Sequence, residues 1–133
     1  MSALPEPRPQ YDLADELQIT GGSGQVDAVI LHVAGAADHD TRHLLQTALG
    51  KAVAQAPAML IVDLTALTFC DSAALNVLLQ ARTDAEAGGT WMVLVGAGPQ
   101  PLHLLALTGT DRLFTIRPHM RAVRPPIPSA RRR

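Results

Sequence analysis

Continuous apolar runs recur along the chain and are separated by stretches with a different periodicity. The run Met59–Val62 is apolar and partly β-branched, which is typical of a strand covered on both faces of a parallel sheet. Similar runs at Ala28–Val33 and Trp91–Val95 predict two further strands of this kind. A short last strand is expected at Leu113–Ile116, and an edge strand near Leu17–Thr20.

After Asp71 the apolar period changes to that of an α-helix. One stripe at helical spacing consists of Ala74, Leu75, Leu78, Ala81 and Ala85. A second stripe carries the polar residues Ser72, Asn76, Gln80 and Thr83, with Leu79 on the border between the two. The pattern predicts a helix that begins near Ser72, buries the alanine and leucine stripe, and ends at Gly88-Gly89.

Two more helices and one turn are expected. The first helix follows Thr41 and is capped by Asp38 or Asp40, and its apolar face is Leu44, Leu45, Ala48, Leu49, Ala52 and Val53. The second is a short helix over Pro101–Leu107, with Leu102, Leu105 and Ala106 facing inward. The stretch Gly21–Gly24 matches neither phosphate-loop pattern and precedes a strand, so it is interpreted as a hairpin turn.

The order of these elements predicts the fold class. Strands alternate with helices after residue 25, which favours a single α/β domain with a mostly parallel sheet and helices packed against it. The first hairpin should add an antiparallel strand at one edge. The expected organisation is a flexible leader over residues 1–10, the domain over residues 11–117, and a proline- and arginine-rich, mostly disordered tail over residues 118–133.

Charge is divided unevenly along the 133 residues. Residues 1–111 contain all 12 acidic residues and four basic ones, whereas residues 112–133 contain seven arginines and no acid. The acidic body argues against nucleic acid as the main partner. The basic tail is interpreted as a solvated segment, with binding to an acidic surface as the alternative.

Several other functions find little support. No apolar run approaches the ~20 residues of a membrane span, and no signal peptide is expected. Cys70 is the single cysteine, so it should be a small buried hydrophobe in a reducing, cytoplasmic setting. The five histidines form no metal-binding motif, so no metal or cofactor is expected. The glycines of the hydrolase motif GxSxG are replaced by Cys70 and Ala74, so the chain is not expected to be an enzyme.

The stretch Leu60–Arg82 resembles the STAS family, the anti-anti-sigma factors typified by a sporulation regulator of Bacillus. Its matches, in order and spacing, are Val62-Asp63-Leu64, Leu67-Thr68-Phe69, Asp71-Ser72 and Leu75. Gly35, Asp38 and Thr41 match a second family segment, and the resemblance covers roughly residues 12–117. Three family residues are replaced by alanine: an acid by Ala36, a second hydroxyl residue by Ala73 and a glycine by Ala74.

The resemblance implies that Ser72 is a phosphoacceptor. A regulator of this kind, acting in a stress response, would bind an anti-sigma factor serine kinase and so release a sigma factor. Phosphorylation of Ser72 would end that binding, and ATP and magnesium would belong to the kinase. The partner-binding residues are expected to be Asp71, Ser72, Ala73, Asn76 and Leu79, with Asp38, His39 and Thr41 from a neighbouring loop. The chain is expected to be a monomer or a weak homodimer.

Alternatives remain for the same residues. Serine at a helix start is often only an N-cap, and Asp71 could itself cap the helix or take part in kinase recognition. Asp63, at the end of the central strand, could make only a loop or cap contact. The rival function is a phosphorylation-independent STAS scaffold or a small-ligand sensor.

Overall fold

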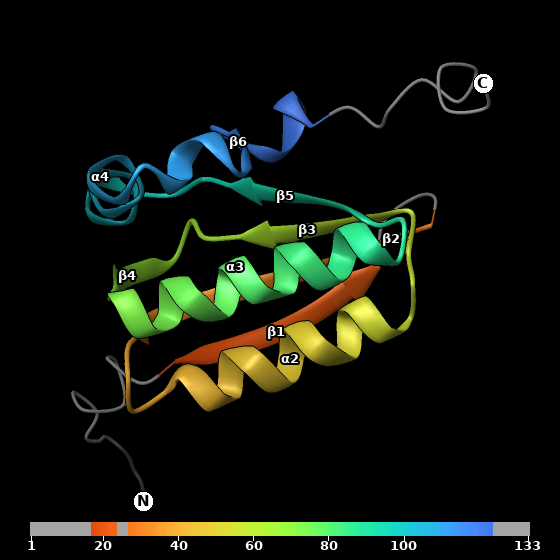
Figure 1. Ribbon diagram of the computed structural model, residues 1–133, viewed down its shortest axis with the longest axis horizontal. Helices are drawn as coiled ribbons and strands as arrows, with labels where there is room; N and C mark the ends of the chain where they lie inside the picture. The colour runs from red at the N-terminus through yellow and green to blue at the C-terminus, as the bar shows by residue number, and fades with distance from the viewer. Residues whose placement is uncertain (1–16, 24–26, 124–133) are drawn as a thin grey trace, which may run out of the picture.

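A six-stranded sheet with two long helices along one face organises the computed structural model, which describes residues 17–23 and 27–123 (Figure 1). The strands are β1 (Gln18–Ser23), β2 (Ala28–Ala37), β3 (Met59–Asp63), β4 (Leu67–Cys70), β5 (Trp91–Val95) and β6 (Thr115–Arg117). The helices are α2 (Arg42–Ala54), α3 (Ser72–Ala87) and α4 (Pro99–Thr108), with 3-10 turns η1 (Thr110–Arg112) and η2 (Met120–Ala122). The predicted α/β class is therefore confirmed.

The sheet has the mostly parallel topology that the alternation of elements predicted. Its main path runs β1-β2-β3-β5-β6, and β4 pairs with β2 off this path. Only the β1–β2 pair is antiparallel, with Gln18 opposite Ala34. The remaining pairs are parallel, so the carboxyl ends of β2, β3 and β5 lie along one edge of the sheet.

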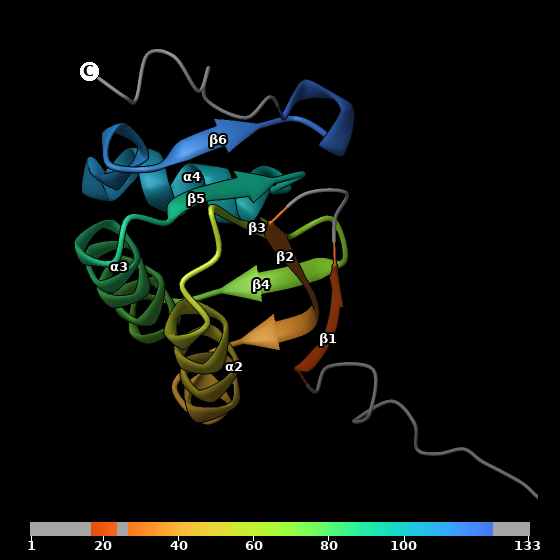
Figure 2. The same ribbon diagram turned by 90° about the vertical axis from the view of Figure 1, so that its right-hand side faces the viewer.

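The central strand is buried on both of its faces. Leu60 and Val62 belong to the main core beneath α2 and α3, whereas Met59 and Ile61 belong to a second cluster with Val93. Neighbouring residues of a strand point to opposite faces, so a strand buried on both sides needs apolar residues at every position. Figure 2 shows α2 and α3 together on the same side of the sheet.

Helix α3 follows the predicted stripes. The five members of the alanine and leucine stripe are all buried, and the four polar residues of the second stripe are all exposed. Asp71 occupies the N-cap position, which the sequence had left open between Asp71 and Ser72, and Gly88 holds the C-cap position, as the glycine pair indicated.

The hairpin and the loop after β3 differ from the predictions. The paired part of β1 includes Gly21 and Gly22, which lie opposite Leu31 and Ile30, so these two residues of the expected turn belong to the strand. The segment between the central strand and Asp71, for which no strand was expected, contains strand β4, which pairs with the end of β2 across a register shift at Gly35. Gly35 has a φ of 98°, a backbone conformation that suits glycine at this irregularity.

Several inward assignments near the edge of the sheet were wrong. Leu102 is 41% exposed and Ala106 is exposed, because α4 buries only the narrow stripe formed by Pro101 and Leu105. Leu44 is 38% exposed for a similar reason, since Leu45 and Leu49 fill the core side of α2. The last strand begins at Thr115, two residues later than expected.

Most of the terminal predictions lie outside the described residues. The leader over residues 1–10 and residues 124–133 of the expected tail belong to this group, and the remaining tail residues include η2. No helix in the described part of the chain is long and apolar enough to cross a membrane.

Candidate functional site

The turn from β4 into α3 places Asp71 and Ser72 at the carboxyl edge of the sheet. Asp71 has extended backbone geometry, and its Oδ1 accepts a hydrogen bond from the Ala74 amide at 3.0 Å. Its carbonyl oxygen accepts from Leu75 at 2.9 Å. Asp71, rather than the serine, therefore caps the helix, and Ser72 is the first helical residue.

Ser72 is exposed and its hydroxyl is not used to hold the fold. Neither the hydroxyl nor the amide of Ser72 bonds to any described residue, and the same is true of the Ala73 amide. These two amides lack helical acceptors because they open α3. The site thus combines an uncommitted hydroxyl with the electropositive end of a helix, where added negative charge is favoured.

Asp71 also joins this turn to the loop between β2 and α2. Its Oδ2 accepts from the His39 amide at 2.9 Å, and its own amide donates to the Ala37 carbonyl at 3.1 Å. One carboxylate therefore fixes two segments that lie 32 residues apart in the chain. The loop residues expected beside Ser72 are held there by these bonds.

The loop itself is closed by Asp38 and Thr41. Asp38 Oδ1 accepts from the amides of Asp40 and Thr41 at 3.0 and 3.1 Å. The Thr41 hydroxyl donates to the Ala36 carbonyl at 2.9 Å and lies 3.1 Å from Asp38 Oδ1. The expected cap of α2 by Asp38 or Asp40 was wrong, because Thr41 holds the N-cap position without a side-chain cap bond and Asp38 acts one turn earlier.

These bonds separate the expected contact residues into two groups. Asp38 and Thr41 are partly buried and shape the loop, whereas His39 presents an exposed side chain. On α3, Asn76 is exposed, and Ala73 and Leu79 are half-buried. The structure brings seven of the eight expected residues to the beginnings of α2 and α3, whereas Leu79 lies midway along α3 and packs against the main core. Whether a partner touches any of them stays a prediction.

A shallow groove runs between the beginnings of α2 and α3. It has a volume of about 530 Å³ and is lined by Arg42, Gln46, Ser72, Ala73, Asn76, Val77 and Gln80. Arg42, Gln46 and Gln80 were missed as site residues. The sequence shows that these residues are polar and lie on helices, but the packing of α2 against α3 across this groove depends on the tertiary fold.

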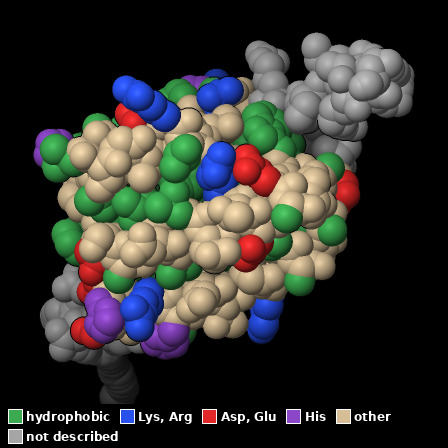
Figure 3. All heavy atoms as spheres, viewed as in Figure 1, with side chains coloured by type: hydrophobic (Ala, Val, Ile, Leu, Met, Phe, Trp, Pro, Cys, Tyr) green, Lys and Arg blue, Asp and Glu red, His purple; other side chains and the backbone are tan. Residues whose placement is uncertain are grey.

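Basic and histidine side chains gather at the corner of this face where α2 begins (Figure 3). Arg42, His39 and His43 are all exposed in this region. Arg42 makes no ion pair or side-chain hydrogen bond with any residue that the structure describes. The Arg42 guanidinium therefore lines the same groove as the Ser72 hydroxyl, and neither group is bonded to a described residue.

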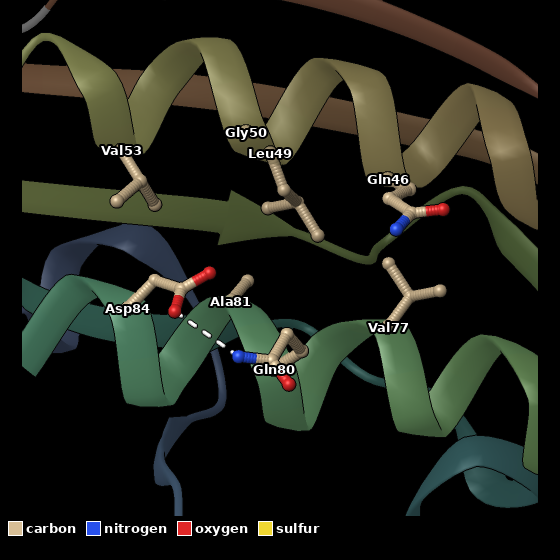
Figure 4. Close-up of a pocket in the computed structure, with 8 residues that line it drawn as sticks. All are labelled: Gln46, Leu49, Gly50, Val53, Val77, Gln80, Ala81 and Asp84. Carbon is tan, nitrogen blue, oxygen red and sulfur yellow. Dashed lines mark hydrogen bonds between the residues drawn. The ribbon is translucent and has the colours of Figure 1, made fainter.

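Farther along, the two helices enclose a smaller pocket of about 200 Å³ (Figure 4). Leu49, Val53 and Val77 supply aliphatic walls, and Gln80 is fixed by a 3.0 Å bond from its Nε2 to Asp84 Oδ1. The volume lies below the ~300 Å³ at which small-molecule sites usually begin. Within the described ranges, no three His, Cys, Asp or Glu residues are placed to hold a metal ion.

Asp63 makes the loop contact that was expected for it at the end of the central strand. Its Oδ1 accepts from the Thr65 amide at 3.0 Å and the Thr65 hydroxyl at 2.6 Å, and its Oδ2 lies 2.8 Å from His32 Nδ1. Burial raises the pKa of Asp63, but the bonds from Thr65 and the nearby His32 outweigh it, so the pKa lies below its usual 3.8. These contacts fix the loop after β3.

Cys70 is buried, as expected, and is unsuited to nucleophilic chemistry. Burial, followed by the negative charge of Asp71, raises the pKa of its thiol to about 11. The Gln100 side chain binds the backbone of Cys70 on both sides, accepting from its amide at 2.8 Å and donating to its carbonyl at 2.7 Å. This pair of bonds attaches α4 to β4 just before the Asp71 turn.

Comparisons with known proteins agree with the resemblance seen in the sequence. Residues 20–123 match the model of the STAS domain family. The anti-sigma-F factor antagonist RsfB of Mycobacterium tuberculosis is 34% identical over 90 residues, which cover 65% of this chain and 72% of RsfB.

Solved structures share the fold. An anti-sigma factor antagonist from Mycobacterium paratuberculosis superposes with a TM-score of 0.73 at 26% identity, over 80% of this chain and 89% of that one. The Bacillus cell fate determinant SpoIIAA in its phosphorylated form gives a TM-score of 0.58 at 18% identity, over 74% and 90% of the two chains. The second likeness is one of fold alone.

Proposed function

This chain belongs to the STAS domain family, and from that premise we propose that it is an anti-sigma factor antagonist that is switched off by phosphorylation of Ser72. In the unphosphorylated state it binds an anti-sigma factor that is also a serine kinase, and the sigma factor is released. ATP and magnesium are bound by that kinase. The name of RsfB supports the role, and the exposed position of Ser72 at the start of α3 supports the modification.

One observation carries the proposal: the Ser72 hydroxyl is exposed at the first position of α3 while Asp71 performs the capping. A serine that capped the helix would have its hydroxyl oxygen engaged with a backbone amide, and the hydroxyl would be less accessible to a kinase. Here the hydroxyl can receive a phosphoryl group without breaking any bond to a described residue. The site is therefore suited to a modification that changes the surface and leaves the fold intact.

The physical basis of the switch is charge at the docking surface. A phosphate adds roughly −1.5 to −2 charges beside Asp71. A partner that covers Ser72, Asn76 and the tip of the adjacent loop would have to desolvate this charge and face its repulsion. Binding is thus blocked directly at the contact surface.

The proposal is tested by intact mass and by binding. After incubation with the candidate anti-sigma kinase and ATP, the wild-type chain should gain one phosphate and Ser72→Ala should gain none. Ser72→Asp should bind the kinase about 10- to 100-fold more weakly, the range expected when a charge is introduced into a desolvated contact. Ser72→Asn introduces a side chain of the size of aspartate but without its charge, and its affinity for the kinase should stay within about threefold of the wild-type affinity.

Two results would overturn the switch. Binding of Ser72→Asp at wild-type strength would show that charge at this position does not control docking. A phosphate gained equally by Ser72→Ala would place the modification elsewhere.

The rival function, a phosphorylation-independent scaffold or small-ligand sensor, makes a different prediction. A sensor would bind nucleotides or lipids tightly with no kinase present. The small interhelical pocket and the open groove beside Ser72 both argue against an enclosed ligand site. Isothermal titration with nucleotides and lipid micelles distinguishes the two, because only the rival expects saturable heat.

A further inference from the structure

We propose that Arg42, the first residue of α2, is the intramolecular counter-ion of phosphorylated Ser72 and holds the phosphate over the groove between α2 and α3. This inference rests on the proposed modification of Ser72 and adds the residue of this chain that receives the phosphate. Arg42 and Ser72 line the same groove, each at the beginning of its helix.

The fold fixes the two beginnings against each other. Asp71 caps α3 through Ala74 and binds the His39 amide in the loop that leads into α2. The two helices start at the same end of the sheet and run alongside each other (Figure 1). The backbones that carry Arg42 and Ser72 are thereby held at a set separation whatever the state of the hydroxyl.

Arg42 is available for a new partner. Its side chain is exposed and forms no ion pair or side-chain hydrogen bond with the described residues. The other described basic side chains near α3 are committed or distant: Arg82 pairs with Glu86 at 3.1 Å, and Lys51 lies in the last turn of α2. Guanidinium groups bind phosphate in a bidentate manner, which makes Arg42 better suited to this role than a lysine.

The rest of the groove suits a phosphate as well. The amides of Ser72 and Ala73 have no acceptor among the described residues, and Gln46 and Asn76 present side-chain amides in the same groove. Carboxylates also lie in the adjoining segments: Asp71 in the β4–α3 turn, and Asp38 and Asp40 in the neighbouring loop. His39 and His43 are exposed on the side of α2. Arg42 is therefore the permanent positive charge that offsets the acidic groups around the phosphate.

This arrangement changes what the phosphate does to a partner. A phosphate bound by Arg42 covers the groove and removes Arg42 from the docking surface at the same time. The surface offered to the partner then loses a hydroxyl, a groove and a cation together. Release is enforced by shape as well as by charge.

The test uses the full chain with phosphoserine inserted at position 72 during translation, so that no kinase is needed. The second ionisation of the phosphate is followed by ³¹P NMR, starting from an ordinary pKa of about 6. Arg42 stabilises the dianion, so Arg42→Gln should raise this pKa by roughly 0.2 to 0.7 of a unit, the range for an exposed ion pair. Arg42→Lys should keep part of the effect.

Lys51→Gln is the matched control, because it removes one exposed positive charge from the other end of α2. It should move the phosphate pKa by less than a third of the Arg42→Gln shift. A phosphate pKa in Arg42→Gln equal to that of the wild type would overturn the proposal. An equal pKa shift in Lys51→Gln and Arg42→Gln would also overturn it. Thermal melts of the variants verify that each is folded.

The same samples separate this inference from the proposed function. If the phosphoserine protein binds its anti-sigma partner at wild-type strength, the switch fails, yet the titration still decides whether Arg42 binds the phosphate. If binding is lost but the titration is unchanged by Arg42→Gln, the switch stands and the role of Arg42 is rejected.

Discussion

At the scale of single residues, one carboxylate defines the candidate site. Asp71 caps α3 with one oxygen and holds the His39 amide with the other. Sequence reasoning had left capping and kinase recognition as alternative roles for this residue. The structure confirms the capping, and it shows why Ser72 is spared from that task.

Replacing Asp71 should therefore loosen the site and lower stability. Asp71→Ala removes the cap and the link to the loop, and we expect the free energy of unfolding to fall by about 1–2 kcal/mol. Asp71→Asn keeps one acceptor oxygen, so it can retain the cap or the loop bond but not both, and its loss should be smaller than that of Asp71→Ala. Urea denaturation measures both, with Asp40→Ala as the control, since Asp40 is an exposed neighbour whose side chain bonds to no described residue. Equal losses in Asp71→Ala and Asp40→Ala would contradict this account.

Asp63 gives a second prediction at this scale, in the pH dependence of stability. Its pKa is lowered in the folded state, so its contribution is present above the ordinary value of 3.8 and is lost as pH falls through the lowered value. Wild type should therefore exceed Asp63→Asn in unfolding free energy at about pH 5, and the gap should narrow towards about pH 2.5. Chemical denaturation across this range provides the measurement. A gap that widened on acidification would show that the carboxylate is not stabilised by Thr65 and His32.

At the scale of elements, the sequence was most informative where period and burial coincide. The prediction succeeded for strands β3 and β5 and for the buried stripe of α3, because nearly every apolar residue in their patterns is buried in the structure. Strand β4 was missed because it is only four residues long and two of them are exposed. The inward face of α4 was overestimated because a helix at the edge of a sheet buries fewer of its apolar residues.

The same reasoning explains what could be foreseen of the site. The position of Ser72 at a helix start followed from local pattern and family resemblance. The groove that also contains Arg42 could not be predicted, because it depends on how closely α2 packs beside α3. Local spacing determines which face a residue occupies, but it does not determine which residue of another helix lies opposite.

Gly96, which follows β5, supplies a prediction about how neighbouring loops fit together. It has a φ of 72°, and a Cβ at this position would lie 2.3 Å from Thr65 Oγ1, which is itself bonded to Asp63. Gly96→Ala should therefore lower the free energy of unfolding by about 2–3 kcal/mol, through left-handed strain together with the clash. Gly50→Ala is the control, because the added methyl in α2 meets nothing within 4 Å and should stabilise the protein by up to about 1 kcal/mol. Denaturant melts that showed the two substitutions to be equivalent would refute the close approach.

At the scale of the whole molecule, the sheet acts as a rigid base for a small surface. Leu60, Val62 and Leu94 are fully buried in the main core, whereas Ser72 and His39 are exposed at the surface. The Asp71 bonds join the two parts of this surface without involving the serine hydroxyl. Modification of Ser72 thus takes place at the surface and does not require the core residues to move.

The last prediction follows from that separation: phosphorylation of Ser72 should change the surface and leave the fold as it is. Comparing ¹H–¹⁵N spectra of the unmodified and phosphoserine proteins, we expect shifts confined to residues 38–46 and 71–80, with β3 and β5 unaffected. The reason is that no bond to a described residue has to break when the hydroxyl is modified. The melting temperature should differ by no more than about 3 °C, because the core is untouched. Shifts spread through Met59–Asp63 or Trp91–Val95 would instead indicate a remodelled domain, and release of the partner would then need a conformational explanation.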